Sequence, residues 1–185
     1  MKIGIFGGTF DPPHLSHTLA CLYILETTDI KKILVVPCYE HPFGKPSVDY
    51  DHRVNMCRLA MRPLQDKVEV STIEGARGGP SYTIDTVKDL KECYPDDNLV
   101  LIIGSDILKE TDEWKDFGEL KQLVEIFILP RIICEDKPIE LATDKFYLPH
   151  ISSTTIRERL KQGKPVDHFL ARSVCDYIKI NQLYK

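Results

Sequence analysis

Short apolar runs alternate with amphipathic stretches along almost the whole chain, and no other sequence feature restricts the fold as strongly. Strands are expected at residues 2–6, 32–36, 68–71, 99–103, 124–129 and, shorter, 146–148. Helices are expected at residues 14–25, 51–61, 81–94, 117–123, 152–162 and 168–181. Continuous apolar strands alternating with helices predict an α/β fold, namely a Rossmann-like, doubly wound parallel sheet buried on both faces. Ligands of such sheets bind beyond the carboxyl ends of the strands.

The chain has 185 residues, which suits one domain, and we expect residues 1–185 to form it, with a small helical C-terminal part from about residue 152. Apolar residues make up 43% and charged residues 28%, as is usual for a folded globular protein. The net charge of −4 provides no broad basic surface, so a nucleic-acid partner is not expected. If the substrates are polyanions, they must be held by locally placed cations or by a metal ion.

The apolar runs and the cysteines indicate the compartment. The longest runs, such as residues 99–103 and 124–129, are far shorter than a membrane span, and the stretch before the first glycines is too short for a signal peptide. We therefore expect a cytoplasmic protein without a membrane partner. The 6 cysteines are scattered and form no C-x-x-C pair, which favours reduced, buried thiols over disulfides or a zinc site.

The turn after the first expected strand has the composition of a phosphate-binding loop. Gly7 and Gly8 permit a sharp turn, and their amides can face phosphate oxygens, as can the N-terminus of the next helix. His14 and His17 are three residues apart and so share one face of that helix. Asp11 is expected to hold the turn through local hydrogen bonds. The string is neither G-x-G-x-x-G nor a P-loop; an ordinary glycine turn with two surface histidines is the alternative.

A second candidate anion site lies at the start of the helix expected at residues 152–162. Ser152, Ser153 and Thr154 are good N-cap residues, which place hydroxyls and free amides where the helix dipole favours phosphate. Arg157 follows about one turn later, and its planar guanidinium suits phosphate oxygens. An ordinary capped helix with a surface arginine is the alternative.

Two further residues stand out near the strongest expected strand. Asp106 follows residues 99–103, at a strand end where a carboxylate can accept ribose hydroxyls; a helix cap is the alternative. Trp114 is the single tryptophan, for which core packing is the ordinary role. Residues 81–86 read as a helix start in which Ser81 can act as the cap.

The string GGTFDPPHLSH at residues 7–17 resembles the histidine motif of the nucleotidylyltransferase superfamily, and it is most similar to the bacterial nicotinate-nucleotide adenylyltransferases. Further segments resemble that family in the same order: SYTIDT at 81–86, GSD at 104–106, Trp114, and ISSTTIR at 151–157. Ser16 stands where the family has glycine. Several motifs in the correct order are far more specific than any one of them, and they extend the resemblance over nearly the whole chain.

The resemblance implies adenylyl transfer in NAD biosynthesis, in which ATP and nicotinate mononucleotide give nicotinate adenine dinucleotide and pyrophosphate. The implied catalytic residues are His14, His17 and Arg157. The implied ATP-binding residues are Gly7, Gly8, Thr9, Phe10, Lys45, Gly104, Asp106, Ile151, Ser152 and Ser153. The pyridine mononucleotide is expected at Tyr82, Thr83 and Trp114. Mg²⁺ is expected to bind together with ATP, with few ligands from the protein.

Some features depart from the family or stay open. HPFGK at residues 41–45 stands where the family often has PPHK, and Arg131 is what remains of the family's RPG motif. The alternative acceptors are nicotinamide mononucleotide and another phosphomonoester, such as phosphopantetheine. A nucleotide-binding regulator without catalysis is the alternative from another class. The sequence leaves open whether the chain forms a homo-oligomer.

Overall fold

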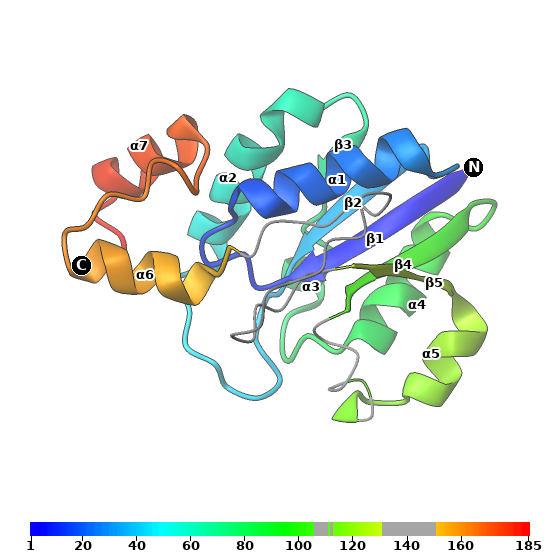
Figure 1. Cartoon of the computed structure of the whole chain (residues 1–185). Helices are drawn as coiled ribbons and strands as arrows, with labels where there is room; N and C mark the ends of the chain where they lie inside the picture. The colour runs from blue at the N-terminus through cyan, green and yellow to red at the C-terminus, as the bar shows by residue number, and fades with distance from the viewer. Residues whose placement is uncertain (106–110, 112, 131–150) are drawn as a thin grey trace, which may run out of the picture.

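A five-stranded parallel sheet forms the centre of the protein (Figure 1). The computed structural model describes residues 1–105, 111, 113–130 and 151–185, so the strand expected at 146–148 lies outside the described residues. The strands follow the order β3-β2-β1-β4-β5, and all neighbours are parallel. Their bounds are Lys2–Gly8 (β1), Lys32–Pro37 (β2), Val68–Val70 (β3), Asn98–Gly104 (β4) and Glu125–Leu129 (β5). The strand order reverses between β1 and β4, which makes this the topological switch point.

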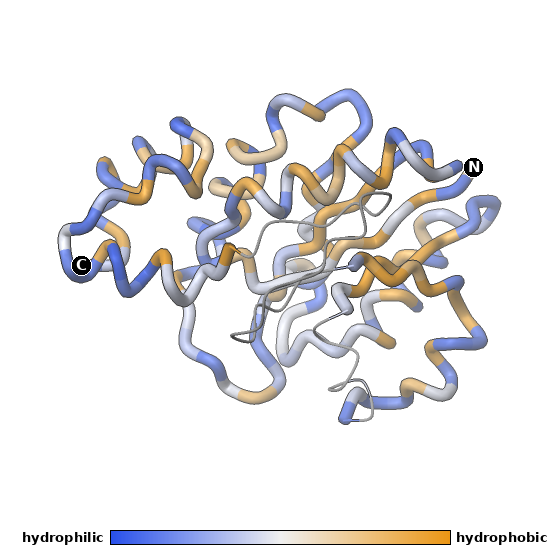
Figure 2. Tube along the Cα trace, in the orientation of Figure 1, coloured by the Kyte–Doolittle hydropathy of each residue, from blue (hydrophilic) through white to orange (hydrophobic). Residues whose placement is uncertain are grey.

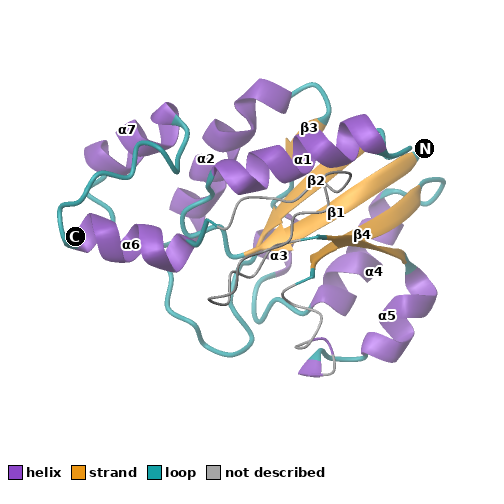
Figure 3. Cartoon of the chain, in the orientation of Figure 1, coloured by secondary structure: helices purple, strands orange, loops and turns teal. Residues whose placement is uncertain are grey.

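Helices cover both faces of the sheet (Figure 3). One layer contains α1 and α2, and the opposite layer contains α4 and α5. Their bounds are Leu15–Thr27 (α1), Tyr50–Met61 (α2), Thr83–Cys93 (α4) and Phe117–Leu123 (α5). The predicted doubly wound α/β fold is thus confirmed. No helix in the described part of the chain has both the length and the apolar character that a membrane span requires.

Alternate side chains of the central strands enter two different hydrophobic cores. On β4, Val100 and Ile102 pack in the core with α1 and α2, whereas Leu99, Leu101 and Ile103 pack in the core with α4 and α5. Because both faces are covered, the strands are apolar at successive positions instead of alternating with polar residues. Figure 2 shows this as orange over most of the interior of the central strands.

The C-terminal helices α6 (Ser153–Lys161) and α7 (Arg172–Ile180) form a third core with α2. Met56 and Ala60 of α2 are buried in this core with Ile156 of α6 and with Val174 and Ile178 of α7. The helical C-terminal part, expected from about residue 152, thus begins with α6 at Ser153. That the whole chain is one domain remains a prediction.

The structure differs from the expected elements at two short helices and at two helix starts, one of which is that of α7, which begins at Arg172 and not at residue 168. The helices α3 (Ile73–Arg77) and η1 (Arg62–Leu64) are not predicted, because neither is long enough to repeat an apolar spacing. Helix α4 begins at Thr83, with Tyr82 and not Ser81 as its N-cap residue.

Candidate active site

A large cavity opens at the switch point and is lined in part by the carboxyl ends of β1 and β4. Its volume is about 730 Å³, which is typical of a small-molecule site. The predicted site residues that line it are Gly7, Gly8, Thr9, Phe10, His14, His17, Lys45, Tyr82, Thr83, Gly104, Trp114, Ile151, Ser152, Ser153 and Arg157. Asp106 lies outside the described residues. The fold thus brings segments that are far apart in the sequence to one cavity.

The turn between β1 and α1 is built around the ring of Phe10. Phe10 has a φ of 51°, in the left-handed region that an aromatic residue rarely adopts, and its side chain is buried. A Cβ atom on Gly8 would lie only 3.1 Å from this ring, so a glycine at that position lets the ring pack closely. The Phe10 ring meets the His17 ring edge-on, with 4.9 Å between centroids. The strained turn therefore fixes the position of an imidazole in the cavity wall.

His14 and His17 lie together at the start of α1, as their spacing predicts. Their buried rings are stacked, with 3.7 Å between centroids. The His14 amide donates a hydrogen bond to Nδ1 of His17 over 3.0 Å. Since Nδ1 of His17 is an acceptor, the neutral ring carries its proton on Nε2. His17 thus lines the cavity with a ring whose Nε2–H group is a donor.

The start of α6 is fastened to the β1–α1 turn. Ser152 is the N-cap residue, as predicted from the sequence, but its hydroxyl makes no capping hydrogen bond. The Ser153 hydroxyl donates to the carbonyl oxygen of Pro12 over 2.9 Å. The first amides of α6 have no partners within the helix and lie at the wall of the cavity. The two expected anion sites are therefore one continuous surface.

Asp11 joins this surface through long-range contacts. It is only 3% exposed. Its backbone carbonyl accepts a hydrogen bond of 2.7 Å from Arg157, and its Oδ1 atom accepts one of 2.7 Å from the Tyr184 hydroxyl. The expectation that Asp11 holds its turn through local hydrogen bonds is wrong in this respect, because partners 146 and 173 residues away approach it in the fold.

Arg53 fastens the loops at the carboxyl ends of β1 and β2, and the sequence did not single it out. Its side chain is 2% exposed. The guanidinium donates to the carbonyl oxygens of Thr9, at 3.0 Å, Tyr39, at 3.1 Å, and Cys38, while Nε donates to Val48 at 2.9 Å. A single arginine on an amphipathic helix gives no sequence signal for such a role, since most arginines in that setting are solvated.

The loop between β2 and α2 forms an outer wall of the cavity. It extends away from the sheet as the cyan segment in Figure 1. His41, Phe43 and Lys45 line the cavity from this loop, and the Lys45 side chain is exposed. Lys45 thus supplies a cation at the mouth of the cavity.

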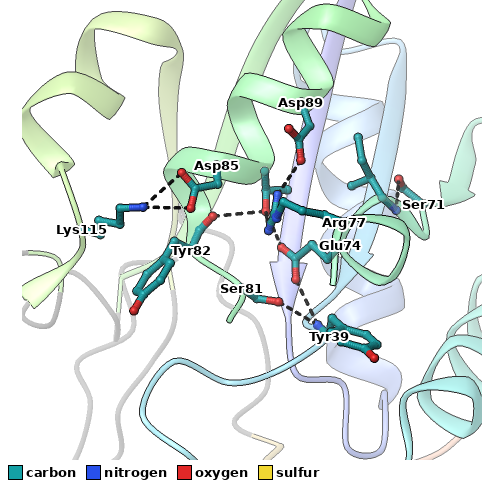
Figure 4. Close-up of polar contacts among 11 residues, drawn as sticks. Tyr39, Ser71, Glu74, Arg77, Ser81, Tyr82, Asp85, Asp89 and Lys115 are labelled. Atoms are coloured by element: carbon teal, nitrogen blue, oxygen red, sulfur yellow. Dashed lines mark hydrogen bonds and ion pairs between the residues drawn. The ribbon is translucent and has the colours of Figure 1, made fainter. Parts of the chain in front are cut away.

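Tyr82, Thr83 and Trp114 form the wall on the α4 side. Trp114 is half-buried and meets Phe117 edge-on, so it both packs in the core and lines the cavity. The Lys115 ammonium lies 4.7 Å from the centroid of the Tyr82 ring and 3.0 Å from a carboxylate oxygen of Asp85 (Figure 4). Lys115 therefore connects the segment that carries Trp114 to the start of α4.

A buried carboxylate, Glu74 of α3, links the two sides of the cavity (Figure 4). Its Oε1 atom accepts a 2.6 Å hydrogen bond from the Thr86 hydroxyl of α4, and its Oε2 atom accepts one of 3.1 Å from the Tyr39 amide after β2. The Ser81 hydroxyl accepts from the same Tyr39 amide at 2.9 Å and from the Glu40 amide, so Ser81 joins two loops instead of capping α4. Sequence analysis missed Glu74 because it did not predict α3.

The thiols differ in burial. Cys21, Cys57 and Cys175 are free and buried, as expected, whereas Cys93 is free but exposed, against expectation. Burial raises the pKa of Cys21 to about 12, and it also raises the pKa of Cys57. Cys134 lies outside the described residues.

Comparison with known proteins identifies the family. The cytidylyltransferase-like family matches residues 5–159. A nicotinate-nucleotide adenylyltransferase of Bacillus subtilis is 38% identical, with 100% of this chain and 98% of the relative covered. A probable nicotinate-nucleotide adenylyltransferase of Methylacidiphilum infernorum is 37% identical, with 99% of this chain and 92% of the relative covered. This chain belongs to the nicotinate-nucleotide adenylyltransferase family.

Solved structures share the fold of this family member. The nicotinic acid mononucleotide adenylyltransferase of Plasmodium falciparum, complexed with NaAD, has a TM-score of 0.81 at 24% identity and covers 99% of this chain and 97% of its own. A putative nicotinate-nucleotide adenylyltransferase of Vibrio parahaemolyticus has a TM-score of 0.77 at 21% identity. Ser16 is 2% exposed in this adenylyltransferase, so its small side chain is accommodated within the first turn of α1.

Proposed function

We propose that this adenylyltransferase joins ATP and nicotinate mononucleotide to give nicotinate adenine dinucleotide and pyrophosphate. The observation that carries the proposal is that hydrogen-bond donors and cations suited to phosphate line the same cavity as two aromatic side chains. The glycine turn, the α6 N-terminus, Lys45 and Arg157 lie in the same cavity wall as Tyr82 and Trp114. That arrangement suits a triphosphate on one side and a pyridine ring on the other.

The reaction needs no nucleophile from the protein. An oxygen of the mononucleotide phosphate, already an anion near neutral pH, forms a bond with the α-phosphorus of ATP. The bond from that phosphorus to the bridging oxygen breaks, and pyrophosphate leaves with the electron pair. Catalysis then depends on positioning the reactants and on stabilising the charge that builds up in the transition state.

We propose that the two histidines and the start of α6 bind the phosphates of ATP. We assign the His17 Nε2–H donor to the α-phosphate, because the hydrogen bond at Nδ1 holds the ring in one tautomer. His14 and Thr9 orient the triphosphate. The amides at the start of α6, with Ser152, Ser153 and Arg157, take its outer phosphates. Arg157 uses two of its five donors on Asp11 and Thr154, which leaves others for a ligand.

Mg²⁺ is proposed to enter with ATP as the substrate MgATP. Among the described residues, no three histidine, cysteine or carboxylate side chains are grouped as a metal site requires. Two carboxylates of the cavity wall, Asp11 and Glu74, accept hydrogen bonds from the protein. Such a wall fits an ion held mainly by phosphate oxygens and water, which is how Mg²⁺ is usually bound beside nucleotides.

Nicotinate is proposed as the acceptor ring because the wall near it offers donors. Thr83 is the first residue of α4, so its amide has no partner within the helix, and its hydroxyl can also donate. Lys115 lies over the Tyr82 ring and is paired with Asp85. The two Thr83 donors satisfy a carboxylate but leave the NH₂ group of a carboxamide facing another donor. An unsatisfied buried group of this kind lowers kcat/KM about tenfold to a hundredfold.

Both the adenylyl-transfer reaction and the preference for nicotinate mononucleotide can be tested by measuring pyrophosphate release with ATP and each mononucleotide in parallel. We expect nicotinate mononucleotide to be preferred by about tenfold or more. Thr83→Val should narrow the ratio, whereas Thr83→Ser, which keeps the hydroxyl, should preserve it. Trp114→Ala should reduce the use of both acceptors, because stacking does not distinguish a carboxylate from a carboxamide.

The outcomes separate the alternatives. Equal kcat/KM values for the two mononucleotides would refute the account of specificity and leave adenylyl transfer in place. If pyrophosphate is released from ATP only when phosphopantetheine is the acceptor, then phosphopantetheine and not a pyridine mononucleotide is the substrate. ATP binding without turnover on any phosphomonoester would favour the nucleotide-binding regulator.

A further inference from the structure

The C-terminal end of the chain reaches back to the proposed ATP side of the cavity. Tyr184, the penultimate residue, donates a hydrogen bond from its hydroxyl to Oδ1 of Asp11 over 2.7 Å. Its neighbour Leu183 packs, like the Tyr184 ring, against the core that α2, α6 and α7 share. The tyrosine is thus held by packing at its ring and by a carboxylate at its hydroxyl.

Asp11 stands between this tyrosine and Arg157. Its Oδ1 atom has the Tyr184 hydroxyl at 2.7 Å and the Val48 amide at 3.4 Å. Its Oδ2 atom lies 3.7 Å from a guanidinium nitrogen of Arg157, which makes a loose ion pair. The same guanidinium nitrogen donates at 2.7 Å to the backbone carbonyl of Asp11. Arg157 is therefore bound mainly by the carbonyl, while Tyr184 provides the short hydrogen bond to the carboxylate.

We propose that Tyr184 is a positioning residue for the adenylyl-transfer site: by holding the Asp11 carboxylate, its hydroxyl keeps Arg157 available to the phosphates of ATP. The inference rests on the proposed function, because it takes the Arg157 side of the cavity as the triphosphate site. Tyr184 itself does not touch the substrate in this scheme. It acts through Asp11 and Arg157.

The physical reason is the burial of the Asp11 carboxylate. A buried carboxylate that loses one donor must find another or remain unsatisfied, and a nearby cation is the strongest substitute. Without the tyrosine hydroxyl, the loose Asp11–Arg157 pair tightens, and the guanidinium turns from the cavity toward Oδ2. Burial and the neighbouring Asp11 both raise the pKa of Tyr184, so the hydroxyl stays protonated and remains a donor at physiological pH.

Tyr184→Phe tests this inference, with Tyr177→Phe as the matched control. Tyr177 is a tyrosine of α7 whose hydroxyl contacts His52 and Asn55 at 3.0 and 3.2 Å, and it is not among the described residues that line the cavity. Tyr184→Phe should weaken ATP binding, measured by calorimetry, and raise the KM for ATP, each about threefold to tenfold, as expected for one lost hydrogen bond. The KM for nicotinate mononucleotide should not change. Tyr177→Phe should leave both KM values at the wild-type level.

A second variant separates positioning from simple loss of structure. In Asp11→Asn/Tyr184→Phe no carboxylate remains to attract Arg157, so ATP affinity should recover toward that of Asp11→Asn alone. Equal ATP affinity in wild type and Tyr184→Phe would overturn the inference, as would an equal rise in both KM values or no recovery in the double variant. Wild-type protein that binds ATP but releases no pyrophosphate would instead refute the proposed reaction, and the ATP-binding comparison would still test Tyr184.

Discussion

At the scale of single residues, the site depends on side chains whose own hydrogen bonds fix their orientation. His17 is held by the His14 amide at Nδ1 and by an edge-on contact with the Phe10 ring. Arg53 is held by backbone carbonyls in a place where water is excluded. Such side chains need little rearrangement when a ligand arrives, and preorganisation of this kind is a main source of transition-state stabilisation.

His17→Ala should therefore lower kcat far more than it raises the KM for ATP. The loss of one preorganised donor typically lowers kcat about a hundredfold to a thousandfold. Steady-state pyrophosphate release measures both parameters, and His52→Ala, on α2 outside the described cavity wall, is the control. A variant with wild-type kcat would remove His17 from the mechanism.

Arg157→Lys keeps the positive charge but loses the planar guanidinium, which donates to both Asp11 and Thr154. We expect the KM for ATP to rise while the KM for nicotinate mononucleotide stays the same. The measurement is a pair of saturation curves, each with the other substrate in excess. Equal increases in both KM values would contradict the placement of Arg157 on the ATP side.

At the scale of elements, the short helix α3 connects α4 to the loop that follows β2. Helix α3 carries Glu74, which binds Thr86 of α4 and the Tyr39 amide after β2. Arg77, at the end of α3, donates to Asp89 at 2.6 Å and so makes a second connection to α4. Although α3 has only five residues, it positions the helix whose N-terminus lines the cavity.

Thr86→Val should test this connection, since valine has nearly the same shape but no hydroxyl. The Glu74 carboxylate would lose its 2.6 Å donor while 7% exposed, and such a loss lowers the free energy of unfolding by about 1–3 kcal/mol. Urea denaturation measures the change. Thr27→Val, at an exposed hydroxyl at the end of α1, should change it by less than about 0.5 kcal/mol. If the free energy of unfolding falls by similar amounts in the two variants, the Thr86–Glu74 hydrogen bond contributes no more to stability than an exposed one.

At the scale of the whole molecule, three cores meet around the cavity. Two lie on opposite faces of the sheet, and the third joins α2 to the C-terminal helices. Helix α2 belongs to two of these cores through different residues: Cys57 packs toward the sheet, and Met56 packs toward α7. The C-terminal helices can therefore influence the proposed phosphate site although their sequence carries no motif of its own beyond residue 157.

A buried thiol in the core that contains α1 and α2 should make the protein less stable at alkaline pH. The pKa of Cys21 is raised to about 12 in the folded protein, whereas the pKa of a cysteine thiol in an unfolded chain is about 8.5. Stability is therefore complete below the unfolded pKa and falls as pH rises toward the folded pKa, because only the unfolded chain releases the proton. Within this window each such group lowers the free energy of unfolding by about 1.4 kcal/mol per pH unit.

Urea denaturation at pH 8 and at about pH 10.5 checks this prediction, since those two values fall near the start of the window and within it. The decline between them should be shallower in Cys21→Ala than in the wild type. Cys93→Ala, at the exposed thiol, should keep the wild-type decline. Parallel declines in all three proteins would contradict the assignment to Cys21.

The sequence by itself determined the order of elements and most of the predicted site. Apolar runs separated by amphipathic stretches specify βαβ units, because strands buried on both faces cannot carry alternating polar residues. The glycine turn, the histidine pair and the α6 start were recognisable because each is a local pattern. All the predicted site residues that the structure describes line one cavity, although their roles remain predictions.

The tertiary structure decided which distant groups support that site. Arg53, Glu74 and Tyr184 make contacts across 12 to 173 residues of sequence, and a single charged or aromatic residue has no pattern that reveals its partner. Ser81 looks locally like a helix cap, yet its hydroxyl binds a loop after β2. A local motif can be read from the sequence because its geometry lies within one turn of the chain. A long-range hydrogen bond exists only after packing has brought its donor and acceptor together.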